Sequence, residues 1–223
     1  MTKEEAVTLY KEKQYKEALQ GLLSCGVDPR DDTEIALYLG LSYSRVNQIR
    51  PAIRLLEHVV AQDKDLLRLS QSRFLLCYLY VLDNRDKDAE MLLAEMAKNG
   101  RQKAQFYSLW AYVAQRRGDL RVAARRYRMA MEADPSHVNT LNGLGFLYAE
   151  MGENLDEALS LCRQAVSAKP SNSAYLDSLG WVLHKMGKNK ESLDYLEMAL
   201  LQAPESEQIR GHVEVVRRSA GRK

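Results

Sequence analysis

Histidine and cysteine are the residues of this sequence whose side chains could most readily bind a metal ion or act as nucleophiles. The four histidines lie far apart along the chain, and none belongs to an HExxH motif or has a histidine partner four residues away. Cys25, Cys77 and Cys162 are also widely spaced and form no CxxC pair for zinc binding or disulfide exchange. We therefore expect no metal site. We interpret the cysteines as buried free thiols of a reducing compartment, with a redox role as the alternative.

The glycine and carboxylate motifs of the chain do not predict catalysis. Gly143 and Gly145 begin a GxG sequence, but Tyr148 occupies the place of the third glycine that a dinucleotide-binding loop requires. The adjacent Asp31 and Asp32 lie in a predicted turn and are typical of residues that begin a helix. Because the P-loop and nucleophile-elbow sequences are absent as well, we expect a non-enzymatic protein that needs no cofactor. A catalytic site assembled from distant segments is the alternative.

The composition excludes several classes of protein. The chain has 223 residues, of which 46% are hydrophobic and 28% are charged, so it has enough apolar content for one large or two small globular domains. No apolar run approaches the roughly 18 residues of a membrane span, and we expect no transmembrane segment. The charged start lacks the apolar region of a secretory signal, which predicts a cytoplasmic protein; a mature form that has lost a signal or lipoprotein anchor is the alternative. The net charge of +2 gives no overall attraction to nucleic acid.

A repeated pattern organises most of the sequence. Three similar segments end at Pro135, Pro170 and Pro204, which are 35 and 34 residues apart. Each segment contains two stretches of about a dozen residues with apolar side chains at helical spacing, separated by a turn that contains glycine. The pattern therefore predicts a helix, a turn and a second helix in every repeat.

Small residues recur at two positions of this repeat. When the register is extended over the chain, it gives six repeats. We expect the recurring small residues to lie where helices pack closely. The eighth position holds Ala6, Gly40, Cys77, Ala111, Gly145 and Gly180, and the twentieth holds Ala18, Ala52, Ala89, Ala123, Ala158 and Ser192.

In spacing and residue types the sequence resembles the tetratricopeptide repeat family, whose 34-residue signature runs W-x2-L-G-x2-Y, then A, F and P. The resemblance covers residues 1–206, although Glu5 and Arg73 stand at positions where the family has apolar residues. It implies an all-α, right-handed superhelical solenoid of about six helix-turn-helix repeats with a C-terminal capping helix. The best matches are Leu141, Leu144, Gly145, Tyr148, Ala158, Cys162, Ala165 and Pro170, and then Leu176, Leu179, Gly180, Leu183, Ser192, Leu196, Ala199 and Pro204.

The chain is divided accordingly. The solenoid is predicted over residues 1–206 and the capping helix over 207–219, where Ile209, Val213 and Val216 share one face. The last residues, 220–223, are expected to be disordered. The predicted repeats span 1–32, 33–69, 70–103, 104–137, 138–172 and 173–206.

In the family that the sequence resembles, the first helices line a concave groove that holds an extended peptide or a partner helix. The groove positions of this chain are aromatic or polar in successive repeats. Aromatic rings bury area at low entropic cost and amides pair with a peptide backbone, so the mixture suits protein recognition. Packing between repeats is the alternative for the aromatic residues. The candidate binding residues are Phe74, Tyr78, Tyr112, Asn139, Asn142, Phe146, Asp177, Trp181 and His184.

A second candidate surface is basic. Between residues 101 and 128 eight side chains are basic and one is acidic. Arg121, Arg125 and Arg128 are spaced four and three residues apart, which places them on one face of a second helix and hence on the convex side. The functional interpretation is an acidic protein, anionic lipid or nucleic acid as partner. The alternative, which we favour, is a solvated face in which Arg128 pairs with Glu132.

Together these features predict a non-enzymatic adaptor whose groove binds a partner protein during assembly of a multiprotein complex. The alternatives are a self-associating scaffold that forms homo-oligomers and, less favoured, a basic-face binder of nucleic acid or anionic membrane. The chaperone clamp of the resembling family needs a set of lysine, asparagine and arginine side chains in three successive repeats. No three successive repeats here show that set, so a chaperone clamp is not expected.

Overall fold

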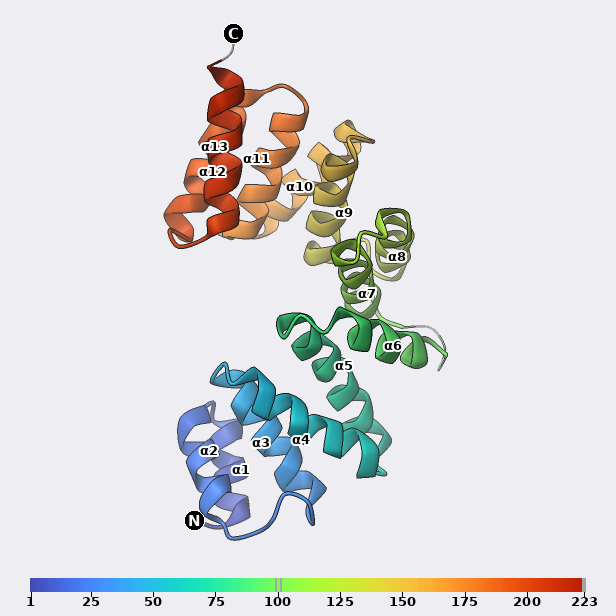
Figure 1. Cartoon of the computed structure of the whole chain (residues 1–223), viewed down its shortest axis with the longest axis vertical. Helices are drawn as coiled ribbons and strands as arrows, with labels where there is room; N and C mark the ends of the chain where they lie inside the picture. Colours follow the sequence, from blue (N-terminus) through green and yellow to red (C-terminus); the bar gives the residue numbers. More distant parts are fainter. Residues whose placement is uncertain (99, 101, 222–223) are drawn as a thin grey trace. The chain divides into compact units, whose positions relative to one another are not determined.

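The computed structural model of the chain describes residues 1–98, 100 and 102–221. These residues form thirteen α-helices and no β-strand, which confirms the predicted all-α class (Figure 1). The helices belong to two compact units, Met1–Gly100 and Arg101–Lys223, called unit 1 and unit 2 below. Each unit is described by itself. The single solenoid over residues 1–206 therefore stays a prediction.

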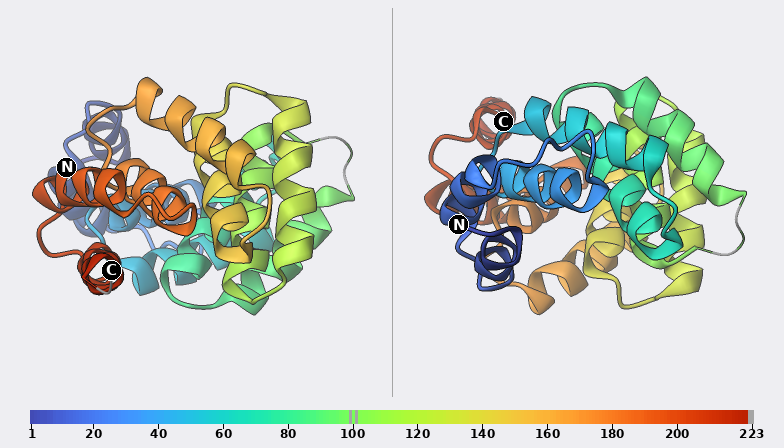
Figure 2. Two further views of the ribbon diagram at one scale, coloured as in Figure 1. Left: turned by 90° about the horizontal axis from the view of Figure 1, so that it is seen from above. Right: turned by 90° about the horizontal axis from the view of Figure 1, so that it is seen from below.

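In both units consecutive helices form antiparallel pairs joined by short turns (Figures 1 and 2). Unit 1 contains α1 (Lys3–Lys11), α2 (Tyr15–Ser24), α3 (Thr33–Arg45), α4 (Ile49–Gln62), α5 (Leu66–Leu82) and α6 (Asp86–Ala97). Unit 2 contains α7 (Ala104–Arg116), α8 (Leu120–Ala133), α9 (Val138–Met151), α10 (Leu155–Ala168), α11 (Ser173–Lys185), α12 (Asn189–Gln202) and α13 (Glu207–Ala220).

Side-chain caps fix the start of several helices. Thr2 accepts the backbone N–H of Glu5 at 3.2 Å, and the Glu5 carboxylate accepts the N–H of Thr2 at 2.8 Å, which together form a capping box. This reciprocal cap explains a glutamate at a position where the repeat pattern expects an apolar residue. Asp32 accepts the N–H groups of Glu34 and Ile35 at the start of α3, which confirms its predicted role as a helix-start residue.

The recurring small residues lie where the two helices of a pair approach each other, as predicted. All twelve are buried. A Cβ atom on Gly145 of α9 would lie 2.6 Å from Cys162 Sγ and 3.0 Å from the carbonyl oxygen of Ala158, both on α10. One on Gly180 of α11 would lie 2.7 Å from Leu196 Cγ of α12. The repeat thus has glycine or another small residue wherever the two helices of a pair come close together.

The turn inside each helix pair is three residues long, and its middle or first residue has a positive φ angle. In unit 2 glycine takes this conformation, as the sequence predicts, for example Gly118 with φ 84° and Gly187 with φ 79°. In unit 1 the corresponding residues are Lys13, Asn47 and Asn84. Glycine adopts left-handed angles without steric cost and asparagine tolerates them, whereas lysine is strained there.

The connections between successive pairs differ in length. The connection from α2 to α3 covers eight residues, 25–32, whereas that from α4 to α5 covers three, 63–65. As a result α5 is 17 residues long and begins at Leu66, four residues before the predicted start of the third repeat. In unit 2 the connections that precede α9, α11 and α13 each have four residues.

Unit 2 has a continuous apolar core. Its buried cluster runs from Ala111 on α7 to Leu183 on α11. At the C-terminal end Ile209, Val213 and Val216 of α13 are buried against α11 and α12, which confirms the predicted apolar face of this helix (Figure 1). The helix continues to Ala220, the first residue of the predicted tail, and residues 222–223 of that tail lie outside the described residues.

Within each unit, the packed helices are neighbours or next-but-one neighbours along the chain. Helix α1, for example, packs mainly against α2 and less against α3, and α11 packs against α9, α10 and α12 and less against α13. None of the helices in the described part of the chain is long and apolar enough to cross a bilayer.

Candidate functional site

The predicted binding residues are distributed over both units. Phe74 and Tyr78 lie on α5 of unit 1, and the others lie on α7, α9 and α11 of unit 2. The structure therefore gives two separate surfaces. The surface in unit 2 contains most of the predicted residues and is called the α9–α11 face.

Two neighbouring first helices build the α9–α11 face. Asn139, Asn142 and Phe146 follow one another at spacings of three and four residues, so they share one side of α9. Asp177, Trp181 and His184 share one side of α11 in the same way. Helix α11 packs against both α9 and α13. It therefore lies between the two, and the three helices follow one another in sequence order.

Trp181 is at the centre of this face. Its ring stacks on the imidazole of His212 from α13, with ring centroids 4.2 Å apart and planes at 18°. Its indole Nε1 donates a hydrogen bond to Glu150 Oε1 at 2.5 Å, and the Lys185 Nζ lies 5.0 Å from the ring centroid. Phe146 lies 6.3 Å from His212, measured between ring centroids. The indole is thus half-buried between the His212 ring and the charged Glu150 and Lys185 side chains, and His212 of α13 covers part of it.

His212 also binds Asp177. Its Nδ1 lies 2.8 Å from Asp177 Oδ1, and because a carboxylate only accepts, the imidazole N–H is the donor. Asp177 is 4% exposed, so this bond satisfies a carboxylate that would otherwise be buried without a partner. Asp177 therefore holds the imidazole that stacks on Trp181, and it is buried where the prediction had it open to the groove.

Sequence reasoning missed His212 and Glu150. The signal for His212 was present, because continuing the 34-residue register beyond the sixth repeat places residue 212 at the sixth position of a further first helix. That position faces the fifth and ninth positions of the preceding first helix, which are Asp177 and Trp181. Glu150 had no comparable signal, because its contact depends on how α9 lies beside α11.

The two asparagines of α9 differ in their partners. The Asn139 side-chain oxygen accepts a hydrogen bond from the Tyr175 hydroxyl of α11. The Asn142 Oδ1 is buried and has no hydrogen-bond partner among the described residues. A buried acceptor without a donor costs about 1–3 kcal/mol. Asn142 therefore offers an unsatisfied amide beside Phe146.

The remaining predicted aromatic residues are open to solvent. Tyr112 on α7 is 44% exposed, with the guanidinium carbon of Arg116 6.0 Å from its ring centroid. Tyr78 on α5 of unit 1 is 50% exposed, and Phe74 is half-buried. About half of each tyrosine is thus not used in packing between helices. His184 is half-buried, and its Nδ1 lies 2.8 Å from Asn189 Oδ1.

The predicted basic face lies on α8, where Arg121, Arg125 and Arg128 are exposed. Arg121 forms an ion pair with Glu153 at 3.0 Å. The suggested pairing of Arg128 with Glu132 is wrong, because the Arg128 guanidinium instead donates two hydrogen bonds to the Tyr148 hydroxyl, at 3.0 and 2.8 Å. The face is therefore partly tied to α9 and to the turn after it.

Gly143 and Gly145 lie in the middle of α9, as expected for repeat packing. A Cβ atom on Gly143 would lie within 2.7 Å of the Tyr127 ring of α8. The two glycines thus admit Tyr127 and Cys162 against the helix and form no phosphate-binding loop.

The thiols are free, and two of the three are buried. Burial raises the pKa of Cys77 and of Cys162 to about 12, so both stay protonated at neutral pH. Cys25 is half-buried at the end of α2, contrary to the expectation that all three are buried. Over the described residues, no three histidine, cysteine, aspartate or glutamate side chains are placed to hold a metal ion.

No protein-family model matches the sequence, and no curated protein matches it. Several solved structures are similar in fold. The crystal structure of YrrB, described as a TPR protein with an unusual peptide-binding site, has a TM-score of 0.56 and 17% identity over 81% of this chain and 91% of YrrB. A tetratricopeptide repeat protein from Parabacteroides merdae has a TM-score of 0.65 and 12% identity over 85% of this chain and 73% of that one.

The longest of these alignments is with the Cut9-Hcn1 hetero-tetramer of the APC/C. It has a TM-score of 0.76 and 12% identity and covers 95% of this chain, but 41% of the matched chain. At these levels of identity the likeness concerns the fold alone. It agrees with the helix-turn-helix pairs of this chain.

Proposed function

From the premise that this chain has the tetratricopeptide repeat fold, we propose that it is a non-enzymatic adaptor that binds a partner protein on the α9–α11 face. The observation that carries the proposal is the half-open aromatic cluster of Phe146, Trp181 and His212 beside the unsatisfied Asn142 amide. Rings that are already held in place lose little entropy when they bind, so such clusters are typical binding hot spots.

The chemistry of the face indicates the kind of ligand. The Asn142 oxygen is buried and needs an N–H donor, which a peptide backbone can supply, at every residue except proline, once the side-chain amide has turned toward the partner. The Trp181 ring supplies an apolar surface for a side chain of the same segment, and Lys185 beside it favours a nearby carboxylate. The partner is therefore an extended segment or the end of a helix that carries an apolar side chain. YrrB supports this proposal, because its fold is similar and its description names a peptide-binding site.

An adaptor of this kind would act in the assembly of a multiprotein complex. The similarity to the Cut9-Hcn1 hetero-tetramer supports that role, because there the same kind of fold is part of a larger assembly. Self-association is the second candidate. It is favoured by three exposed apolar side chains at the α12–α13 end of unit 2, Met198, Leu201 and Val215, of which Leu201 is 78% exposed.

Affinity purification from the native cell lysate tests the proposal. Wild-type protein is compared with the Phe146→Ala/Trp181→Ala double variant, and circular dichroism checks that both are folded. Met91→Ala is the matched control, because Met91 is a 72% exposed apolar residue on α6 of unit 1. We expect one set of proteins to be retained by the wild type and the control and to be lost from the double variant.

Identical protein sets for all three chains would contradict the proposal. In that case the molar mass in solution, measured over a range of protein concentrations, decides whether the chain self-associates. A mass that rises with concentration in the wild type, but not in Leu201→Glu, would favour the scaffold.

A further inference from the structure

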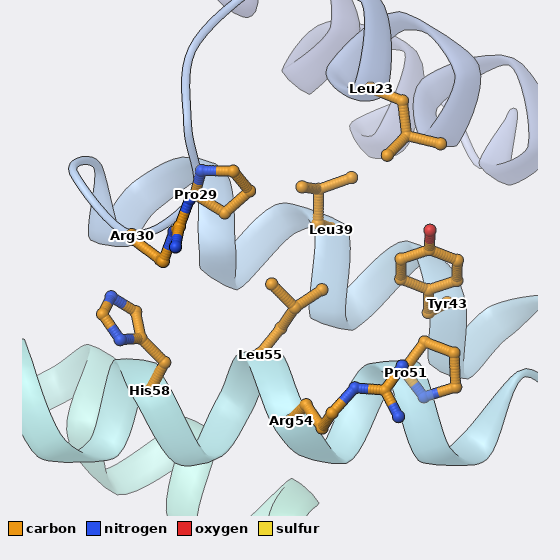
Figure 3. A pocket seen from close by; sticks show the side chains of 9 residues that line it. All are labelled: Leu23, Pro29, Arg30, Leu39, Tyr43, Pro51, Arg54, Leu55 and His58. Carbon is orange, nitrogen blue, oxygen red and sulfur yellow. The ribbon is translucent and has the colours of Figure 1, made fainter.

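Unit 1 contains a cavity of about 320 Å³ between α2, α3 and α4 (Figure 3). Leu39 and Tyr43 of α3 lie on its wall. Leu37 and Leu41 stand at the fifth and ninth positions of the second repeat, the positions that Asp177 and Trp181 hold in the sixth. Leu39 and Tyr43 are two residues beyond them and so lie about 200° around the helix from these predicted groove positions. The cavity therefore opens on a different side of α3 from the predicted groove, and it is independent of the proposed function.

The long connection from α2 to α3 creates this space. Its eight residues include Asp28, Pro29 and Arg30, and the last two line the cavity. The Asp28 carboxylate accepts the backbone N–H of Arg30 at 2.8 Å and pairs with its guanidinium at 2.6 Å, which holds the connection in a fixed turn. These bonds lower the pKa of Asp28 to about 2, so it stays ionised and bound to Arg30. The turn holds Pro29 at one side of the space, as Figure 3 shows.

The floor and lip of the cavity are apolar. Leu39 is buried in the core of unit 1, and Tyr43 and Leu55 are half-buried against the same core. Leu23 of α2 stands at the opposite side in Figure 3 and is 59% exposed. A volume near the lower limit for ligand sites, about 300 Å³, suits one large side chain better than a bulky cofactor.

The polar side chains of the cavity are Arg30, which is paired with Asp28, together with Tyr43, Arg54 and His58. Arg54 of α4 is exposed and forms no ion pair within the described residues. His58, one turn further along α4, points toward the Pro29–Arg30 segment, and its Nε2 is buried without a hydrogen-bond partner. Among the described residues no aspartate or glutamate lines the space, and Asp28 beside it is already paired with Arg30. In Figure 3 the Arg54 guanidinium points toward Pro51 and the His58 imidazole toward Pro29, so Arg54 is the group that can pair with a carboxylate of a bound segment.

We propose that this cavity is a second docking site, which takes a large apolar side chain of an acidic peptide segment and pairs a flanking carboxylate of that segment with Arg54. The apolar floor receives the side chain, and the Arg54 guanidinium at the rim pairs with the carboxylate next to it. The chain would then bind a partner at two sites with different chemistry, one in each unit.

Peptide binding to the full-length chain tests the proposal. The probe is a fluorescein-labelled acetyl-Gly-Glu-Asp-Trp-Glu-Asp-Gly peptide, measured by fluorescence anisotropy. One control peptide has lysine in place of the acidic residues, and the other has glycine in place of tryptophan. Methyl NMR spectra show where the peptide binds, because Leu23, Leu39 and Leu55 lie in the cavity.

Two variants and one control complete the experiment. Arg54→Glu reverses the charge at the rim, and Leu23→Glu places a carboxylate at the exposed lip; both positions are open enough to keep the fold. Lys87→Glu is the matched control, because it makes the same change of charge at an exposed residue of α6. We expect at least a tenfold loss of affinity in each cavity variant and less than about a twofold change in the control.

Several results would overturn the proposal. They are no binding of the acidic tryptophan peptide at about 1 mM, equal weakening by Arg54→Glu and Lys87→Glu, or equal affinity for the peptide with glycine in place of tryptophan. Methyl shifts confined to leucines of unit 2 would also overturn it. The double variant at Phe146 and Trp181 should bind this peptide like the wild type, which separates the two sites.

Discussion

The two units are built from the same kind of helix pair but differ in how the pairs are joined. In unit 2 every connection between pairs has four residues, and the buried core is continuous from α7 to α11. In unit 1 the connections have eight and three residues. The long one leaves a cavity beside it, and after the short one Leu66 and Leu67 are exposed at the start of an extended α5. Uniform spacing thus accompanies a continuous core, and the long connection of unit 1 accompanies a cavity with an apolar floor. Unit 2 also has a hollow, of about 470 Å³, but polar side chains such as Gln102, Asp134 and His137 line most of it.

The turns inside the pairs show the same contrast. Each turn inside a pair of unit 2 has a left-handed glycine, and the α9–α10 turn adds Asn154 with φ 50°, whereas the turns of unit 1 use lysine or asparagine alone. Each non-glycine residue there has a conformational cost, of about 1–2 kcal/mol for a side chain such as lysine. We therefore expect unit 1 to open at lower denaturant concentration than unit 2.

The largest expected effect is on thiol reactivity, which compares the units directly because Cys77 lies in unit 1 and Cys162 in unit 2. Burial raises the pKa of both thiols from 9.0 to about 12, so the reactive thiolate is about a thousandfold less populated at pH 8. Alkylation followed by mass spectrometry should modify half-buried Cys25 first. With rising urea, Cys77 should react before Cys162; the reverse order would contradict the comparison.

The same thiols give a pH dependence of stability. A pKa that is raised in the folded state means that the folded chain binds the proton more tightly than the unfolded chain does. The stabilising contribution is therefore complete below pH 9 and is lost as the pH rises toward 12. Cys162→Ala should flatten that part of the profile in unit 2, as measured by urea unfolding at a series of pH values.

Next in size is the effect of adding a methyl group at the eighth repeat position. Gly145→Ala places Cβ against Cys162 Sγ and a backbone carbonyl of α10, so we expect a loss of about 2 kcal/mol in the free energy of unfolding. In unit 1 the Cβ of Gly40→Ala would meet the Leu56 side chain at 3.0 Å, which can shift. There the gain in helix propensity should offset the crowding to within about 0.5 kcal/mol.

Urea unfolding measures these changes with two signals. Circular dichroism reports all helices, whereas tryptophan fluorescence reports unit 2, because Trp110 and Trp181 both lie there. Gly211→Ala is the control, since no atom lies within 4 Å of its Cβ position. Equal destabilisation by Gly145→Ala and Gly40→Ala would show that the two units pack with the same tolerance.

A similar or slightly smaller effect is expected at the Asp177–His212 bond of unit 2. Asp177→Ala removes the acceptor and should lower the free energy of unfolding by about 1–3 kcal/mol. It should also change the emission of Trp181, which stacks on His212. Asp177→Asn keeps an acceptor at this place and should restore most of both signals. An unchanged spectrum in Asp177→Ala would mean that the bond does not position the imidazole.

The smallest effect concerns the turns. Lys13→Gly relieves a left-handed lysine in unit 1 and should raise the free energy of unfolding, by about 1 kcal/mol at most. In unit 2 Gly118→Ala, at φ 84°, should lower stability by a similar amount. The two changes in stability have opposite signs because the left-handed residue is lysine in the turn of unit 1 and glycine in the turn of unit 2. The same sign for both variants would contradict the assigned turn strain.

Much of the fold could be predicted from the sequence, because its repeat information is local. Helical periodicity predicts the helix pairs, and the small residues at the eighth and twentieth positions predict the contacts inside each pair. Asp32 could be identified as a cap from residue type alone. The early start of α5 could not, because the sequence around residues 63–69 lacks a proline or glycine that would delay the helix.

The candidate site was predictable only in part. The side of α9 and α11 that carries Phe146 and Trp181 follows from spacing, whereas the coverage of Trp181 by His212 depends on how a further helix packs. The burial of Asp177 follows from the same contact. The cavity in unit 1 depends on the path of an eight-residue connection, and no periodic pattern encodes that path.

Packing between sequence neighbours has a consequence for how the chain acquires its structure. Since each strong helix contact joins elements one or two apart, the mean separation of contacting residues is short relative to the chain length. Low contact order is associated with folding in microseconds to milliseconds. Each helix pair can therefore form as it leaves the ribosome and serve as the template for the next, without waiting for distant segments to be synthesised.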